Sequence, residues 1–60
     1  MLKYFSTISK ARRFAEANCA FQELMIIFDK EEHEYCVVNQ EGRGHLDKLN
    51  WDFKIVEVWD

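Results

Sequence analysis

The longest run of hydrophobic residues is Leu24–Phe28, in the middle of the 60-residue chain, bounded by Glu23 and Asp29. The run is too short to span a membrane, and its branched and aromatic side chains favour a strand over a helix. A short apolar run between charged residues is typical of a strand that is covered on both faces. We therefore predict a strand over residues 21–28 at the centre of the fold.

Three further segments rich in aromatic and branched residues predict strands over residues 2–5, 33–38 and 51–59. The polar segment 29–32 predicts a tight hairpin in which Phe28 lies opposite His33. In this register both faces of the hairpin carry apolar side chains: Leu24, Ile26, Phe28, Tyr35 and Val37 on one face, and Met25, Ile27 and Cys36 on the other. The last strand places Phe53, Ile55 and Trp59 on one face and Val56 and Val58 on the other.

One main helix is predicted over residues 9–18. The apolar stripe of this helix follows three- and four-residue spacing and consists of Ile8, Ala11, Phe14 and Ala15. Ser6, Thr7 and Ser9 are each suited to cap its first turn, and Asn18 to end it in a left-handed conformation. Residues 39–44 predict a loop, and residues 45–49 predict a single helical turn that Asn50 stops.

These elements predict one domain, residues 1–60, of the α+β class. We expect a small β-α-β-β-(short α)-β sandwich, with a mostly antiparallel sheet of three to four strands and one main helix on one face. The layout is similar to that of many very small cytoplasmic proteins of bacteria and their viruses, without matching one family.

Composition and charge limit the kinds of partner and the cellular compartment that we expect. The formal net charge of −3 argues against general affinity for nucleic acid or anionic membranes. We expect no secretion signal and no membrane anchor, because the N-terminal residues have no long apolar segment and no small-residue cleavage pattern. Two cysteines, Cys19 and Cys36, do not make a disulfide framework, so we expect a reduced cytoplasmic protein.

Two groups of residues could bind metal. Cys19, His33, Cys36 and His45 are zinc-ligand types, but their spacing lacks any Cys-x2-Cys pair, so we predict neither a metal nor a cofactor. The acidic group lies around the hairpin turn and consists of Asp29, Glu31, Glu32 and Glu34. It lacks the glycine and the alternating oxygens of a calcium loop. It is either a solvated turn that discourages aggregation or an acidic recognition patch.

We predict no enzyme activity. The chain has no nucleophile elbow, and Gly42-Arg43-Gly44 lacks the length and the lysine of a phosphate-binding loop. So small a core also leaves little room for an enclosed substrate cavity.

The amount of apolar sheet surface suggests a function. One ten-residue helix and one helical turn cannot cover both faces, and leftover apolar surface usually marks an interface. We therefore expect a non-catalytic protein-interaction module, acting as a regulator, adaptor or inhibitor, that is covered by a protein partner or by a second copy as a homodimer. The expected contact residues are Met25, Ile27, Trp51, Val56, Val58 and Trp59.

A nucleic-acid-binding domain is the alternative. A basic patch would use Lys10, Arg12, Arg13 and Arg43. No aromatic string typical of RNA-binding sheets accompanies these residues, so the protein-interaction hypothesis is preferred.

Overall fold

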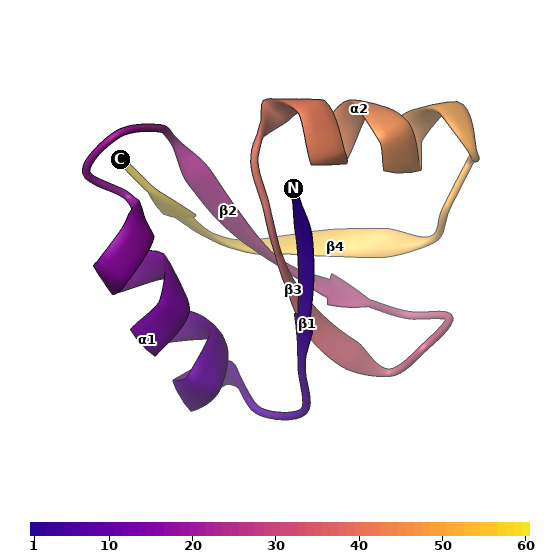
Figure 1. Cartoon of the computed structure of the whole chain (residues 1–60). Coiled ribbons are helices and arrows are strands. Elements are labelled where there is room, and N and C mark those ends of the chain that lie inside the picture. Colours follow the sequence, from indigo (N-terminus) through magenta and orange to yellow (C-terminus); the bar gives the residue numbers. More distant parts are fainter.

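The computed structural model describes residues 1–60 and contains four strands and two helices. Their order is β1 (Leu2–Phe5), α1 (Ile8–Asn18), β2 (Leu24–Asp29), β3 (Glu34–Val38), α2 (Gln40–Lys48) and β4 (Phe53–Trp59) (Figure 1). The strands form one antiparallel sheet in the order β1-β3-β2-β4. This confirms the predicted α+β class and the predicted order of elements.

The two helices lie on opposite faces of the sheet (Figure 1). Helix α1 connects β1 to β2 across β3, and α2 connects β3 to β4 across β2. Both connections step in the same direction across the sheet, but they join pairs of strands that run in opposite directions. Two connections of the same hand must then place their helices on opposite faces. The sheet is therefore the middle layer of three.

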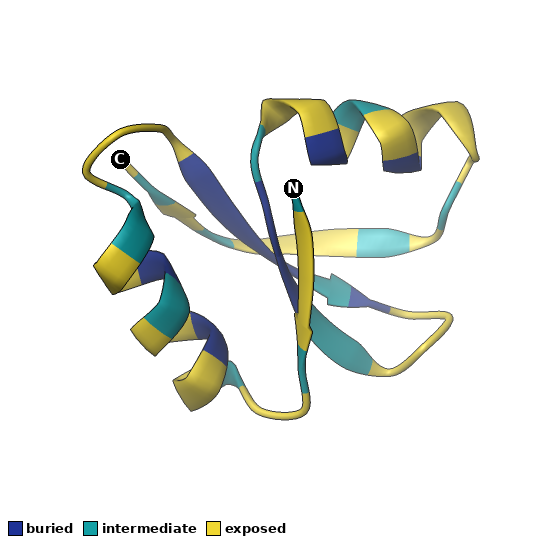
Figure 2. Cartoon of the chain, in the orientation of Figure 1, coloured by how far each residue is buried: buried dark blue, intermediate teal, exposed yellow.

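The first face of the sheet is covered by α1. Its buried alanines, Ala11 and Ala15, allow the helix to lie close to the buried side chains of Leu24, Ile26 and Val37 (Figure 2). Thr7 caps the helix by accepting a hydrogen bond from the Lys10 backbone N–H at 3.3 Å. Asn18 ends the helix differently from the prediction: it is not left-handed, and its side-chain amide donates to the Phe14 carbonyl at 2.8 Å.

The second face is covered by α2, which is longer than predicted. The prediction of a loop over residues 39–44 is wrong, because the helix begins at Gln40 and has nine residues. Asn39 is its N-cap and accepts hydrogen bonds from the Gly42 backbone N–H at 2.9 Å and from the Met1 amino group at 2.8 Å. The expectation of a second face with almost no helix of its own is thereby corrected.

The end of α2 directs the chain back to the sheet. Asn50 has φ of 53° and stops the helix, as predicted. Its backbone N–H donates to the Asp47 carbonyl at 3.1 Å, and that of Trp51 donates to Leu46 at 3.0 Å. This pair of hydrogen bonds is a Schellman motif, and it brings Trp51 and Leu46 into the same apolar cluster.

The hairpin register differs from the prediction by two residues. Phe28 lies opposite Tyr35 and not opposite His33, because β2 continues to Asp29 and the turn occupies residues 30–33. A shift of two residues leaves every side chain on its predicted face. The predicted assignment of side chains to the two faces of the hairpin is therefore confirmed.

Strand β4 contains a bulge that the sequence pattern did not reveal. Ile55 pairs with Ile27 and Glu57 pairs with Ile26, so Val56 is an extra residue in the strand. The bulge reverses the alternation, and it places Trp59 on the α1 face although Phe53 and Ile55 lie on the α2 face. The prediction that these three side chains share one face is wrong.

The two glycines of α2 should respond to alanine in opposite ways. A Cβ at Gly42 would overlap the backbone carbonyl of Met1, whereas a Cβ at Gly44 has no atom within 4 Å. We expect Gly44→Ala to raise the free energy of unfolding by about 0.5–1 kcal/mol, because alanine is the better helix former. Gly42→Ala should lower it by about 1–3 kcal/mol through overpacking. Urea denaturation of both variants measures the difference, and shifts of the same sign would contradict this packing of Met1 on α2.

Candidate protein-interaction surface

Asp29 is the only buried charged residue, and its carboxylate is fully hydrogen-bonded. One oxygen, Oδ2, accepts hydrogen bonds from the Tyr4 hydroxyl and the Trp51 indole N–H, both at 2.8 Å. The other, Oδ1, accepts from the backbone N–H groups of Glu31 at 2.9 Å and Glu32 at 3.0 Å. The carboxylate thus joins β1, the β2–β3 turn and the segment that leads into β4.

The pKa of Asp29 reflects two opposed effects. Burial raises the pKa, but the hydrogen bonds from the turn, Tyr4 and Trp51 together outweigh burial and hold it below its usual value. Burial and the hydrogen bond to Asp29 raise the pKa of Tyr4. Tyr4 therefore stays a neutral donor and Asp29 an ionised acceptor over the physiological pH range.

The four acidic residues predicted as one group are separated by the structure. Asp29 points into the molecule, whereas Glu31 accepts the Asp52 backbone N–H at 2.9 Å and supports the start of β4. Glu32 is exposed and Glu34 is partly exposed, so these two are the members left to form an acidic surface.

The predicted metal-ligand types also lie apart. Cys19 belongs to the cluster under α1, and Cys36 is buried on the opposite face, in the cluster under α2. His33 is in the hairpin turn, and His45 is on α2. No three His, Cys, Asp or Glu side chains are grouped in a way that could hold a metal ion.

The basic residues of the nucleic-acid alternative do not form one patch. Lys10, Arg12 and Arg13 lie on α1, whereas Arg43 lies on α2, across the sheet. Arg12 is engaged by Glu57, and Arg43 is 3.9 Å from Asp47 and also contacts the sulfur of Met25. The structure adds no observation in favour of nucleic-acid binding.

The six predicted contact residues divide into two groups. Met25 and Ile27 are buried beneath α2, Trp51 is bound to Asp29, and Trp59 packs against the α1 cluster. These four belong to the protein's own core or its margin, because the bulge places Trp59 on the α1 face and α2 is long enough to cover Met25 and Ile27. Val56 and Val58 lie at the surface.

The exposed part of β4 is the candidate surface. We define the β4 strip as Ile55, Val56 and Val58, of which Val58 is 57% exposed. Strand β4 pairs only with β2, so its other edge carries no neighbouring strand. Ile55 was not among the predicted contact residues, because the prediction placed it on the face opposite Val56 and Val58.

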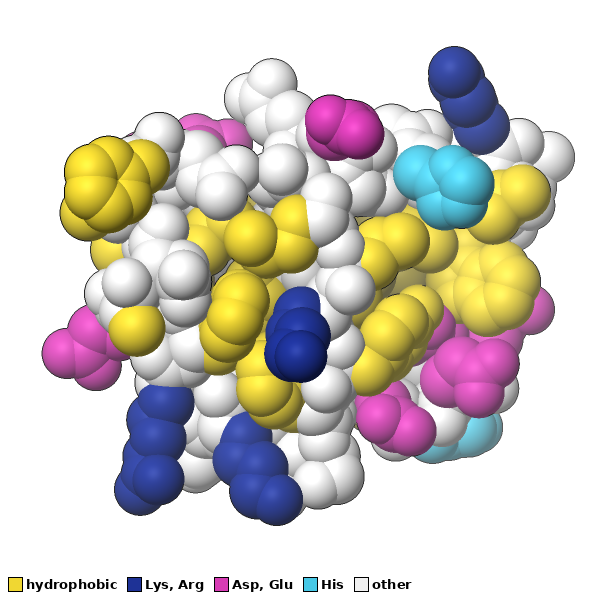
Figure 3. Space-filling model, viewed as in Figure 1, with side chains coloured by type: hydrophobic (Ala, Val, Ile, Leu, Met, Phe, Trp, Pro, Cys, Tyr) yellow, Lys and Arg dark blue, Asp and Glu magenta, His cyan; other side chains and the backbone are white.

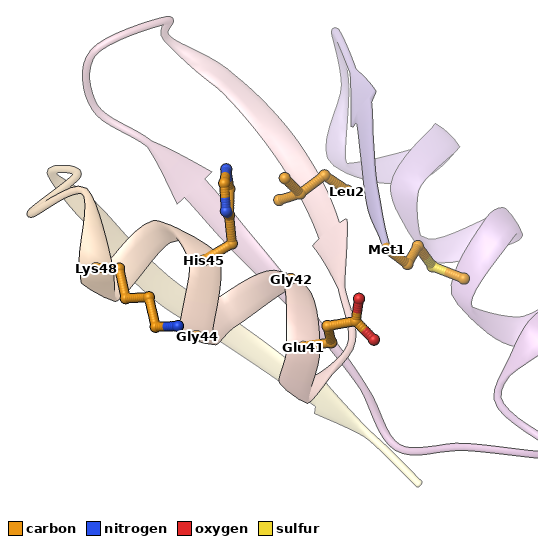
Figure 4. A pocket seen from close by; sticks show the side chains of 7 residues that line it. All are labelled: Met1, Leu2, Glu41, Gly42, Gly44, His45 and Lys48. Carbon is orange, nitrogen blue, oxygen red and sulfur yellow. The ribbon is translucent and has the colours of Figure 1, made fainter.

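A hollow lies between β1 and α2. It has a volume of about 460 Å³ and is lined by Met1, Leu2, Glu41, Gly42, Gly44, His45 and Lys48 (Figure 4). Glu41, His45 and Lys48 come from one side of α2, and Leu2 faces them from β1. Around it, hydrophobic side chains gather along β1 and beneath α2, with acidic side chains near the hairpin turn (Figure 3). The polar side chains that line the hollow, Glu41, His45 and Lys48, are all exposed, and no buried side-chain polar atom lacks a hydrogen-bond partner.

Comparison with known proteins gives no further guide. No family model, curated protein or solved structure matches the chain. Neither helix has the length and apolar character needed to cross a membrane.

Replacement of Asp29 should expose how much the fold depends on its carboxylate. Asp29→Ala leaves the Tyr4 hydroxyl, the Trp51 N–H and two backbone N–H groups without their acceptor, and we expect a loss of about 3 kcal/mol or more in the free energy of unfolding. Asp52→Asn is the matched control, because Asp52 is exposed and its contact with Lys30 is long, at 3.8 Å. Equal effects of the two substitutions in urea denaturation would contradict the role of Asp29.

The same carboxylate should make stability depend on pH. The pKa of Asp29 is lower in the folded protein than in the unfolded chain, so its contribution is complete above the unfolded pKa and is lost as the pH falls through the folded pKa. We expect the wild-type protein to lose stability below about pH 4 and Asp29→Asn to lose less over that range. Urea denaturation between pH 2 and pH 7, with both proteins measured at each pH, tests the sign, and parallel curves would contradict it.

The two thiols should differ in reactivity. Burial raises the pKa of Cys36 to about 11, whereas Cys19 is partly exposed. We expect iodoacetamide at pH 8 to alkylate Cys19 in the native protein and Cys36 only after unfolding. Mass spectrometry of digested protein distinguishes the two sites, and equal native labelling would show that the cover provided by α2 opens readily.

Proposed function

We propose that this chain is a small non-catalytic protein-interaction module that binds another polypeptide along β4. The observation that supports the proposal is the combination of an unpaired strand edge with the exposed aliphatic side chains of the β4 strip. A strand added to such an edge gains main-chain hydrogen bonds, and the side chains of the strip provide apolar contacts. The module would act as a regulator, adaptor or inhibitor in the cytoplasm, where its two free thiols would stay reduced.

The other sheet edge is less suited to this role. Strand β1 has four residues, against seven in β4. A short edge strand is one of the devices by which proteins avoid pairing with other chains. Of the two exposed apolar side chains on β1, Tyr4 is also committed to Asp29 through its hydroxyl.

Val58 is the member of the β4 strip that contributes least to packing. Val58 lies opposite Met25 but remains more than half exposed, so a polar substitution there removes little buried area. We therefore expect Val58→Lys to change the free energy of unfolding by less than about 0.5 kcal/mol, as is usual for surface positions. Binding through β4 should be weakened at least tenfold, because a lysine would be placed at the contact.

Photo-crosslinking in cell extract tests the proposal whichever polypeptide the partner is. p-Benzoyl-phenylalanine in place of Val58 should form polypeptide adducts on irradiation. An excess of unlabelled wild-type protein should suppress adducts to a different polypeptide, and should itself appear in the adducts if the partner is a second copy. Phe21, which is 95% exposed in the α1–β2 loop, provides the matched control position. The Val58→Lys protein should fail to compete. No adduct from position 58, or equal adducts from positions 58 and 21, would contradict the proposal.

A further inference from the structure

We infer that the strand received by β4 is β4 of a second copy of this chain, in an antiparallel pair whose two-fold axis passes between Ile55 and Val56. This inference rests on the proposed function and names its partner. The pairing would join two four-stranded sheets into one sheet of eight strands, with both α1 helices on one face and both α2 helices on the other. A closed symmetric pair of this kind is the commonest assembly of identical chains.

The bulge makes this register possible. In a regular strand, residues that are an odd number apart point to opposite faces, so an axis between two residues would set inward side chains against outward ones. The extra residue Val56 shifts the alternation by one. Phe53 and Val58 therefore lie on the α2 face together, and Lys54 and Glu57 lie on the α1 face together. An axis between Ile55 and Val56 then matches the faces, whereas an axis through Val56 does not.

Two registers place side chains of the same face opposite each other, and the charges on β4 favour the one with its axis between Ile55 and Val56. With the axis between Ile55 and Val56, Lys54 of each copy lies opposite Glu57 of the other, so the pair contains two matched contacts of opposite charge. An axis one residue further along, between Val56 and Glu57, also matches the faces but sets Lys54 opposite Trp59. Opposite charges directly across an antiparallel pair are favourable, and they fix the register.

Glu57 and Lys54 are both charged and available for this contact in each copy. Glu57 Oε2 accepts from Arg12, whose Nε lies at 2.9 Å, and Oε1 accepts from the Trp59 indole N–H at 3.0 Å. The hydrogen bonds from Arg12 and then Trp59 lower the pKa of Glu57, so the group remains ionised. Oε1 retains a lone pair for a further donor. Lys54 is exposed and makes no ion pair within its own chain.

Apolar contacts accompany these charge pairs. On the α2 face Phe53 lies opposite Val58 of the second copy, and next to the axis Ile55 lies opposite Val56, the extra residue of the bulge. The side chains of the β4 strip, which each copy leaves exposed, are thus placed beside apolar neighbours. An aromatic side chain opposite a branched one is a favourable cross-strand pair.

Charge reversal provides the test. Sedimentation of the wild-type protein from 1 to 300 µM should show a monomer–dimer equilibrium, and Lys54→Glu or Glu57→Lys alone should each weaken dimerisation at least tenfold. An equimolar mixture of the two variants should dimerise again, because each reversed charge then meets its opposite. Lys10→Glu, an exposed change of the same charge on α1, should leave the equilibrium unchanged.

Cysteine pairing gives a second measurement that does not disturb the Arg12–Glu57 contact. In a Cys19→Ser background, Phe53→Cys and Val58→Cys proteins should form a mixed disulfide when combined under air oxidation. Neither protein should form a disulfide-linked dimer by itself. If the axis lay between Val56 and Glu57 instead, Ile55→Cys and Val58→Cys would be the pair of proteins that forms the mixed disulfide.

A wild-type monomer at every concentration, or no recovery of dimer in the mixture, would overturn the inference. If adducts from position 58 to a different polypeptide persist in that case, the proposed function stands and only the second copy is wrong. Absence of both dimer and adducts overturns both, and the bulge would then serve to keep the edge unpaired.

Discussion

The arrangement of this protein depends on a single buried carboxylate. Asp29 ends the central strand β2. Its side chain lies on the α2 face and accepts hydrogen bonds from Tyr4 of β1, from the backbone of the hairpin turn and from Trp51, just before β4. Hydrogen bonds to an ionised group contribute about 1.5–3 kcal/mol each and are not additive. Their more important effect here is geometric, because three segments far apart in sequence meet at one point. The Lys30 N–H that donates to Asp52 at 3.0 Å extends the same junction into the start of β4.

The topology explains why β4 is left open. Two helices of eleven and nine residues must cover two faces of a four-stranded sheet. Helix α1 provides cover over β1, β3 and β2, and α2 packs over the central strands, so the outer strand β4 receives least shelter on its α2 face. The surface that remains on that face is apolar and lies on an edge. A small chain thus concentrates its capacity for association in one strand.

Much of the architecture was predictable, because the pattern of hydrophobic residues along a strand follows from which of its faces are buried. The central run Leu24–Phe28 indicated a strand covered on both faces, and the structure buries four of its five residues. Helix α2 was not predictable from propensity, since Gly42 and Gly44 favour a loop. The structure shows that Asn39, a residue type preferred at the N-cap, is the one local signal for its start. The bulge at Val56 leaves no mark in the alternation, so Trp59 was assigned to the wrong face. Asp29 resembles the other acidic turn residues in sequence, and only the positions of Tyr4 and Trp51 distinguish it. The prediction of exposed aliphatic side chains on the sheet therefore described the chemistry of the candidate site. Of its three residues, it named only Val56 and Val58.

The most direct measurement of strand pairing at β4 is amide hydrogen exchange as a function of protein concentration. An unpaired edge exposes its outward N–H groups to water, and pairing with another strand protects them. We expect protection at residues 53–59 to increase between dilute and concentrated wild-type protein, while the amides of β1 exchange at unchanged rates. Exchange in β4 that is rapid and independent of concentration, with and without cell extract, would contradict association through this strand.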